Sequence, residues 1–253
     1  MTFELTTKAF WDKMWSNTSA KKFDFKDKYY IYELEGMLKK ILPENASFLE
    51  VGCAASGWLP YFYNNFGYEV WGIDYFLKGC FLAKKNLELN SAKGNIICGD
   101  IFEHPLKYEK FDVVFSSGLI EHFTKPDLVL EELISFLKPG GTLITLIPNL
   151  NGLNGLIARM TDKVSFVKHN IIDKAGLRYL YNSAKLQRVS VEYIGVYGIH
   201  GIGCGVNKHA KSFLLFMRDS ANYCLTSIFK GLRLSCNFKF LSPMIVAIGE
   251  KGQ

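Results

Sequence analysis

Residues 48–59, which read FLEVGCAASGWL, constrain this chain more than any other stretch. They begin as a short apolar run, which favours a strand buried on both faces of a parallel sheet. The small residues that follow let the backbone turn sharply and approach a ligand closely. Trp58 then begins a segment that can form a helix, with Pro60 tolerated in its first turn. A strand, a tight loop and a helix N-terminus in this order predict a nucleotide-type binding cradle.

The acidic residue before the turn, Glu50, narrows the choice of ligand. In a dinucleotide-binding fold the phosphates lie on the glycine turn, and a carboxylate there would repel them. A cationic sulfonium compound with an amino-acid end would tolerate the carboxylate. The position of Glu50 therefore favours a cation and counts against a nicotinamide-dependent dehydrogenase, which we keep as a rival.

These residues resemble the first motif of the class I S-adenosylmethionine-dependent methyltransferases, which reads acid-x-Gly-x-Gly-x-Gly. Glu50 and Gly52 match the motif, while Ala54 and Ser56 stand where the later glycines would be. Gly57 follows one position on. The resemblance implies S-adenosyl-L-methionine as cofactor and S-adenosyl-L-homocysteine as product. It also implies cofactor contacts by Glu50, Gly52, Ala54 and Gly57.

A second strand is predicted over residues 68–74, and its last residue, Asp74, lies 24 positions after Glu50. This is close to the ~20 residues that separate a phosphate-type loop from a ribose-binding acid. Neighbouring parallel strands end at the same edge, so the two carboxylates should converge. The resemblance assigns Asp74 to the ribose hydroxyls, with Tyr75 or Phe76 beside the adenine. The alternative for Asp74 is an N-cap for a helix over residues 76–89.

The third strand, residues 95–102, ends in Gly-Asp-Ile. In the family that this chain resembles, an acid at this point binds the adenine amino group and the next apolar residue contacts the ring. Asp100 and Ile101 match those two positions. A turn without a ligand is the alternative, because Gly and Asp are both common in turns.

The fourth strand and its loop, residues 111–123, contain Ser117 and the pair Glu121-His122. Small-molecule methyltransferases of the ubiquinone-pathway type carry a similar Glu-His pair, so we expect Ser117 at the cofactor and His122 as a candidate catalytic base. A histidine bonded within its loop is the alternative. Enzymes that methylate nucleic-acid amines hold a flipped base with an Asn/Asp-Pro-Pro-aromatic motif. That motif is absent after this strand, and no Pro-Cys nucleophile appears, so nucleic acid is not favoured as acceptor.

The rest of the chain completes an α/β pattern. A helix over 127–137, a Lys-Pro-Gly-Gly turn and a strand over 142–147 are followed by strands over 190–197 and 242–249, with a long helix over 208–232 between them. We predict one domain, a Rossmann-like three-layer α/β/α sandwich with a seven-stranded, mostly parallel sheet and a helical cap and lid. Its parts would be an N-terminal helical cap (1–42), a cofactor-binding core (43–148), an acceptor-binding lid (149–189), and terminal strands and helix (190–253).

The N-terminal segment, residues 3–40, is interpreted as largely helical. Phe10, Trp11, Met14 and Trp15 cluster on one helical face, which suits either a cap over the cofactor or ordinary core packing. Residues 21–28 are polar enough to predict an exposed loop.

Composition limits the compartment and the ligands. The six cysteines show no CxxC and no metal-ligand spacing, so we expect buried thiols in a reducing cytoplasm and no metal. No apolar run approaches the ~18 residues of a membrane-spanning helix, and no signal peptide is recognisable. Nothing in the sequence predicts the oligomeric state.

Charge is divided unevenly along the chain. Residues 1–150 carry 16 basic and 19 acidic residues, whereas residues 151–253 carry 14 basic and 5 acidic ones, including every arginine. A basic C-terminal part suits an anionic acceptor, although a solvated basic face is the alternative. The candidate acceptor-binding residues are Arg159, His169, Arg178 and His200, with Lys163 and Lys168 adding to the same field.

Together these features predict transfer of a methyl group to a polar, anionic small molecule or sugar, with O-methylation favoured. The sulfonium methyl is already activated, so the protein must mainly align the reactants and exclude water. Three alternatives remain: an N-methyltransferase, a module of the same fold that binds the cofactor without catalysis, and the nicotinamide-dependent dehydrogenase.

Overall fold

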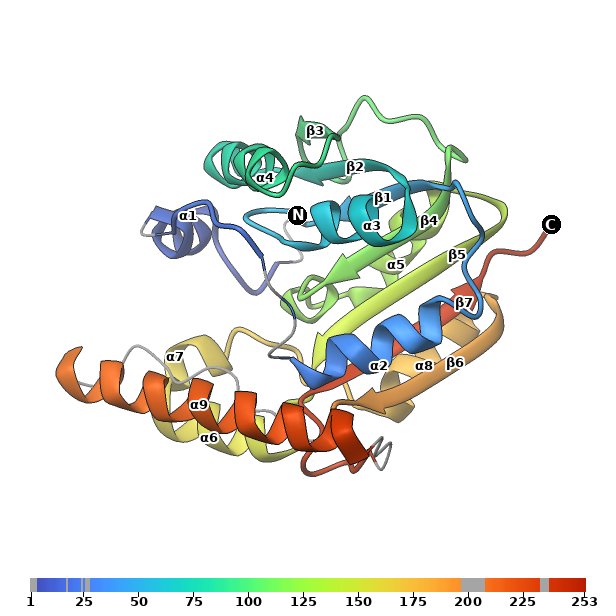
Figure 1. Cartoon of the computed structure of the whole chain (residues 1–253). Helices are drawn as coiled ribbons and strands as arrows, with labels where there is room; N and C mark the ends of the chain where they lie inside the picture. The colour runs from blue at the N-terminus through green and yellow to red at the C-terminus, as the bar shows by residue number, and fades with distance from the viewer. Residues whose placement is uncertain (1–3, 17, 24, 26–27, 197–207, 233–236) are drawn as a thin grey trace.

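The computed structural model describes residues 4–16, 18–23, 25, 28–196, 208–232 and 237–253. Seven strands form one sheet in the order β3-β2-β1-β4-β5-β7-β6 (Figure 1). The strands are β1 (Ser47–Val51), β2 (Glu69–Asp74), β3 (Asn95–Cys98), β4 (Phe111–Ser117), β5 (Leu137–Pro148), β6 (Gln187–Ile194) and β7 (Met244–Glu250). Strands β1 to β5 pair in parallel, and β7 runs antiparallel to both β5 and β6. The predicted seven-stranded, mostly parallel sheet is confirmed.

Helices cover both faces of this sheet, as a three-layer sandwich requires. They are α1 (Lys8–Ser16), α2 (Tyr29–Leu38), α3 (Trp58–Phe66), α4 (Leu77–Leu89), the 3₁₀ turn η1 (Ile120–His122), α5 (Pro126–Ser135), α6 (Leu153–Thr161), α7 (Lys163–Phe166), α8 (Lys174–Ser183) and α9 (Lys208–Leu232). Helices α2, α3 and α4 share one buried core with the sheet, and α5 and α8 share the other. Along β1, Phe48 enters the first core and Leu49 the second. This alternation is the reason that Phe48, Leu49 and Val51 can all be apolar although they point to opposite faces.

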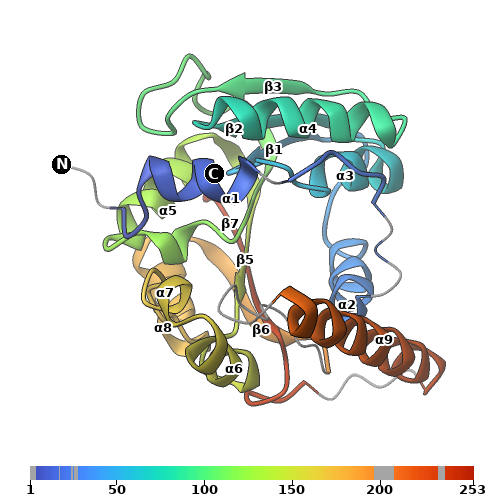
Figure 2. The same ribbon diagram turned by 90° about the vertical axis from the view of Figure 1, so that its left-hand side faces the viewer.

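The carboxyl ends of β1, β2 and β4 meet at one edge of the sheet. Val51 pairs with Ile73 of β2 and with Ser116 of β4, so the residues just beyond these strands are neighbours. Figure 2 views this edge and shows α1 crossing in front of it. Parallel α/β sheets bind ligands at such an edge because the loops there converge.

The N-terminal segment contains two helices, α1 and α2. The described residues between them are in neither helix nor strand, which agrees with the predicted break at residues 21–28. Of residues 21–28, Lys21 and Lys22 are exposed as predicted, but Phe25 is half-buried because it stacks on Trp58 with ring centroids 5.4 Å apart. The side chain of Asn86 accepts the backbone N–H of Lys21 at 3.0 Å and helps to hold this segment against α4.

Two boundaries in the second half also differ from the prediction. The Lys-Pro-Gly-Gly stretch, residues 138–141, lies inside β5 as an irregularity, because Leu137 and Thr142 both pair with β4. Helix α8 falls within the predicted lid, 149–189, yet it packs against β6 and β7. Within the parts of the chain that the structure describes, no helix combines the length and the apolar character that crossing a bilayer needs.

Candidate functional site

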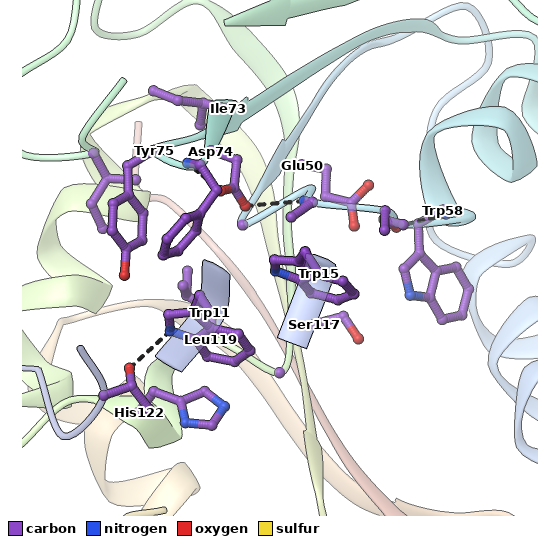
Figure 3. A pocket seen from close by; sticks show the side chains of 18 of the residues that line it. Trp11, Trp15, Glu50, Trp58, Ile73, Asp74, Tyr75, Ser117, Leu119 and His122 are labelled. Carbon is purple, nitrogen blue, oxygen red and sulfur yellow. Dashed lines mark hydrogen bonds between the residues drawn. The ribbon is translucent and has the colours of Figure 1, made fainter. Parts of the chain in front are cut away.

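A cavity of about 340 Å³ opens at the carboxyl ends of β1, β2 and β4. This volume lies in the range of small-molecule sites. The structure brings every predicted cofactor residue, and the predicted catalytic one, to its wall: Glu50, Gly52, Ala54, Gly57, Asp74, Tyr75, Asp100, Ile101, Ser117 and His122. Figure 3 shows Glu50 and Asp74 on one side of this pocket and His122 on the other.

The loop after β1 depends on two glycines. Gly52 has a φ of 78°, in the left-handed region that favours glycine, and its N–H donates to the Ile73 carbonyl at 2.9 Å. Gly57 lies against the N-terminal segment, since a Cβ there would stand 2.5 Å from the Phe23 ring. The loop can therefore lie flat between β2 and the residues that cover it.

Glu50 is the most deeply buried carboxyl group at the pocket wall, with 1% of its surface exposed. Burial raises its pKa to about 8, and hydrogen bonds from Ser56 and from the Leu59 backbone oppose the shift only in part. Among the described residues, no hydrogen-bond donor reaches its Oε2 atom. A buried carboxylate oxygen without a partner needs a hydrogen-bond donor, and a cationic ligand would supply one.

Asp74 ends β2 with its side chain turned into the loop. One carboxylate oxygen accepts the Ala54 N–H at 3.0 Å and the other accepts the Phe76 N–H at 2.9 Å. Burial raises the pKa of Asp74 to about 6, although these two hydrogen bonds lower it in part. Phe76, not Asp74, is the N-cap residue of α4, so Asp74 orders the turn before the helix without capping it directly. Each oxygen keeps a lone pair for a ligand.

Tyr75, Asp100 and Ile101 line the far end of the pocket beyond β2 and β3. The Tyr75 hydroxyl donates to a Glu4 carboxylate oxygen at 3.3 Å, which ties the N-terminus to this end. Asp100 is exposed and accepts the Phe102 N–H at 2.9 Å, so the turn expected as the alternative is present beside the pocket. Ile101 is buried.

The N-terminal segment closes the pocket. Trp11 and Trp15 of α1 line it and stack on each other, with ring centroids 6.2 Å apart. The Trp11 indole N–H donates to the Thr6 hydroxyl at 2.9 Å, and its ring meets the His122 ring edge-on at 4.9 Å. Sequence reasoning found the Trp11 cluster but missed further lining residues, namely Glu4, Thr6, Phe23, Phe25, Lys28 and Tyr30. The aromatic residues between 23 and 30 could have indicated that this segment is partly buried, but the lysines among them favoured an exposed loop.

His122 ends η1 and is held in one tautomer. Its Nδ1 lies 3.2 Å from the Lys168 carbonyl oxygen, an acceptor, so Nδ1 carries the proton and donates. Burial, together with the neighbouring His169, lowers the pKa of His122 to about 4, so the ring is neutral near pH 7. Burial raises the pKa of the adjacent Glu121 to about 8. The ring therefore offers Nε2 as a lone-pair donor.

The predicted acceptor residues divide into three groups. His169 lies beside the pocket, with its ring centroid 4.5 Å from that of His122. Arg159 is exposed on α6 over the Phe166 ring and does not line the cavity. Arg178 does not reach the site either, because its guanidinium donates to the Val191 carbonyl of β6. His200 lies outside the described residues.

Comparison with known proteins agrees with this geometry. Residues 49–145 match the model of a methyltransferase domain family. No protein of curated function matches the chain in sequence.

Several solved structures share the fold. The chain is similar to a methyltransferase of Haloferax volcanii in complex with the Trm112 methyltransferase activator, at 16% identity over 90% of this chain and 92% of that one, TM-score 0.60. It is also similar to a SAM-dependent methyltransferase of Thermotoga maritima, at 19% identity over 89% and 91%, TM-score 0.58. Phosphoethanolamine N-methyltransferase 2 of Haemonchus contortus with bound S-adenosyl-L-methionine matches at 17% identity over 88% of this chain and 53% of that one, TM-score 0.59.

Proposed function

We propose that the chain, whose residues 49–145 match a methyltransferase domain family, is a class I S-adenosylmethionine-dependent methyltransferase that transfers the methyl group to a polar, anionic small molecule or sugar, at an oxygen atom. One observation carries the proposal. Glu50 of β1, Asp74 of β2 and His122 of η1 line one cavity that the N-terminal segment covers.

The proposed cofactor contacts follow from the carboxylates. Glu50 would accept a hydrogen bond from the cofactor's amino group, which would satisfy its Oε2 atom. Asp74 would accept from the ribose hydroxyls with the lone pairs that its two backbone bonds leave. Tyr75 and Ile101 would contact the adenine ring, and Asp100 its amino group. The sulfonium charge would be favoured by these acids, as the sequence argument expected.

The proposed chemistry is in-line displacement at the methyl carbon. The acceptor oxygen forms a bond to the methyl carbon while the carbon–sulfur bond breaks, and the sulfur keeps the electron pair. The hydroxyl proton must leave, and His122 is the neutral ring on the pocket wall that can receive it at Nε2. Trp11 covers this end and would exclude water.

The charges around the pocket support an anionic acceptor. Glu4, Glu50, Asp74 and Asp100 line the cofactor part of the cavity. At the His122 end, Lys168 accepts the His122 Nδ1–H through its carbonyl and places its Nζ 4.8 Å from the Phe10 ring centroid. An acceptor with a phosphate or carboxylate group would be attracted to that end.

N-methylation is the second candidate, and the low pKa of His122 favours it. A ring whose conjugate acid has a pKa of about 4 is a weak base near pH 7. A neutral amine attacks with its own lone pair and needs no base before the transfer. One neighbour in fold is a phosphoethanolamine N-methyltransferase, whose substrate is both an amine and an anion.

The test is a screen of acceptors that measures S-adenosyl-L-homocysteine production, with each phosphorylated or carboxylated compound paired with its neutral analogue. We expect turnover with an anionic acceptor and a higher KM in Lys168→Gln. Lys93→Gln, which changes an exposed lysine before β3 at the opposite edge, should leave KM unchanged. Mass spectrometry of the product would identify the methylated atom. Turnover confined to neutral acceptors would contradict the proposed charge.

A further inference from the structure

Three side chains that ligate metals in other proteins converge beside the pocket. They are Glu121 and His122 of η1 and His169, which follows α7. One ligand atom from each lies within 4.8 Å of the others. The backbone fixes this convergence, because the Asn170 N–H donates to the Glu121 carbonyl at 2.6 Å. Two segments that are distant in the sequence thus bring a carboxylate and two imidazoles together.

Glu121 gives an independent indication of a ligand. Its side chain is 2% exposed, and within the described part of the chain neither carboxylate oxygen has a hydrogen-bond partner. Burying a carboxyl group without a partner is costly, so such groups usually bind a donor or a cation. The imidazoles of His122 and His169 are the neighbours that would share a cation with it.

The hydrogen bond of His122 gives a second indication. Its Nδ1–H donates to the Lys168 carbonyl, which leaves the Nε2 lone pair for a ligand. Histidines that bind metals nearly always donate their other ring N–H to a carbonyl or carboxylate in this way. The same bond also orients the ring and keeps it rigid.

We propose that Glu121, His122 and His169 bind one divalent first-row transition-metal ion beside the cofactor pocket. Two imidazoles and one carboxylate suit zinc, manganese, iron or cobalt more than calcium or magnesium. Metal–ligand bonds of about 2.0–2.2 Å place ligand atoms roughly 3–3.5 Å apart, so the three side chains would close in by about 1.5 Å. Rotation of the long Glu121 side chain can supply part of that movement.

Three protein ligands leave coordination positions open. His122 also lines the cavity beside Trp11, so an acceptor oxygen could occupy one of these positions. This role rests on the proposed methyl transfer, whereas metal binding does not. An acceptor hydroxyl bound to the ion would release its proton to water more readily. The oxygen would then attack the methyl carbon, and Nε2 of His122 would act as a ligand instead of a base.

The sequence predicted no metal site, and the structure explains why this cluster escaped notice. His169 lies 47 positions after His122, so no short motif links the ligands. Hydrogen bonds of Lys168 and Asn170 with η1 help to bring them together.

The test uses the full chain without an affinity tag, stripped of metals and titrated with Co²⁺, whose visible absorption reports coordination. We expect one Co²⁺ ion per chain. Glu121→Gln and His169→Gln should each weaken binding at least tenfold, since loss of even an outer contact to a ligand typically costs 10–100-fold. His104→Gln is the matched control, because His104 also lies beside a glutamate, Glu132 at 3.2 Å, but outside this cluster. It should bind Co²⁺ like the wild type.

Thermal melting and titration with S-adenosyl-L-methionine check that the variants remain folded. If Glu121→Gln does not fold, the less buried His169→Gln decides the matter. The metal site would be overturned if the wild-type protein did not bind Co²⁺ stoichiometrically, or if both variants bound Co²⁺ as tightly as the wild type. Either result would leave the proposed function intact. Co²⁺ binding without any S-adenosyl-L-homocysteine production would support the site and count against methyl transfer.

Discussion

Glu50→Gln should make the cofactor-free protein less sensitive to pH. Burial raises the Glu50 pKa from 4.5 to about 8, so the folded chain holds this proton more tightly than the unfolded chain does. A raised carboxyl pKa contributes stability that is fully present below pH 4.5 and is lost as pH rises to 8. Glutamine has nearly the same shape but does not ionise, so the variant lacks this contribution.

The size of the effect follows from the shift. Each pKa unit corresponds to about 1.4 kcal/mol, so the unfolding free energy of the wild type should fall by about 3.5 kcal/mol more than that of Glu50→Gln between pH 5 and pH 8. Glu121 also has a raised pKa, but it is present in both proteins and its contribution cancels in the difference. Asp74 repels the Glu50 carboxylate, so the difference reports Glu50 together with its interaction with Asp74.

Urea denaturation at several pH values measures this quantity. Glu88→Gln, at an exposed position of α4, is the control and should follow the wild type. The same Glu50→Gln variant should bind S-adenosyl-L-methionine more than tenfold more weakly, because a charge-assisted hydrogen bond is worth about 1.5–3 kcal/mol. Parallel stability curves for wild type and variant would refute the assignment of a buried, uncompensated carboxyl group to Glu50.

Three further predictions concern binding. Asp74→Ala should weaken S-adenosyl-L-methionine binding by about 1.5–3 kcal/mol in calorimetric titration, and unchanged affinity in a folded variant would remove Asp74 from the site. Trp11→Ala should weaken it by about 0.5–1.5 kcal/mol through loss of aromatic contact, whereas Met14→Ala, at an exposed position of the same helix, should not; equal effects would mean that α1 does not cover the ligand. Arg178→Gln should lower the melting temperature and leave the acceptor KM unchanged, because its guanidinium bonds to β6; a raised KM in a folded variant would restore Arg178 to the acceptor site.

The sheet and its ligand edge could be predicted from the sequence because both follow from local rules. Short apolar runs such as residues 48–51 favour strands buried on both faces, and neighbouring parallel strands end at one edge. Glu50, Asp74 and Asp100 each lie at or near the end of such a run, so their arrival at one cavity follows from that topology. The resemblance to the family motif then indicated which ligand to expect at that cavity.

The tertiary structure decided what lies against that edge. Phe23 and Phe25 enter the pocket because side chains of α4 hold their segment, and no periodicity in residues 21–28 records that contact. Arg178 faces the sheet because α8 packs there, although its charge alone suited an acceptor. The meeting of His169 with His122 depends on hydrogen bonds across 47 positions. Contacts between segments distant in sequence depend on how the whole chain packs, so residue type and spacing alone could not reveal them.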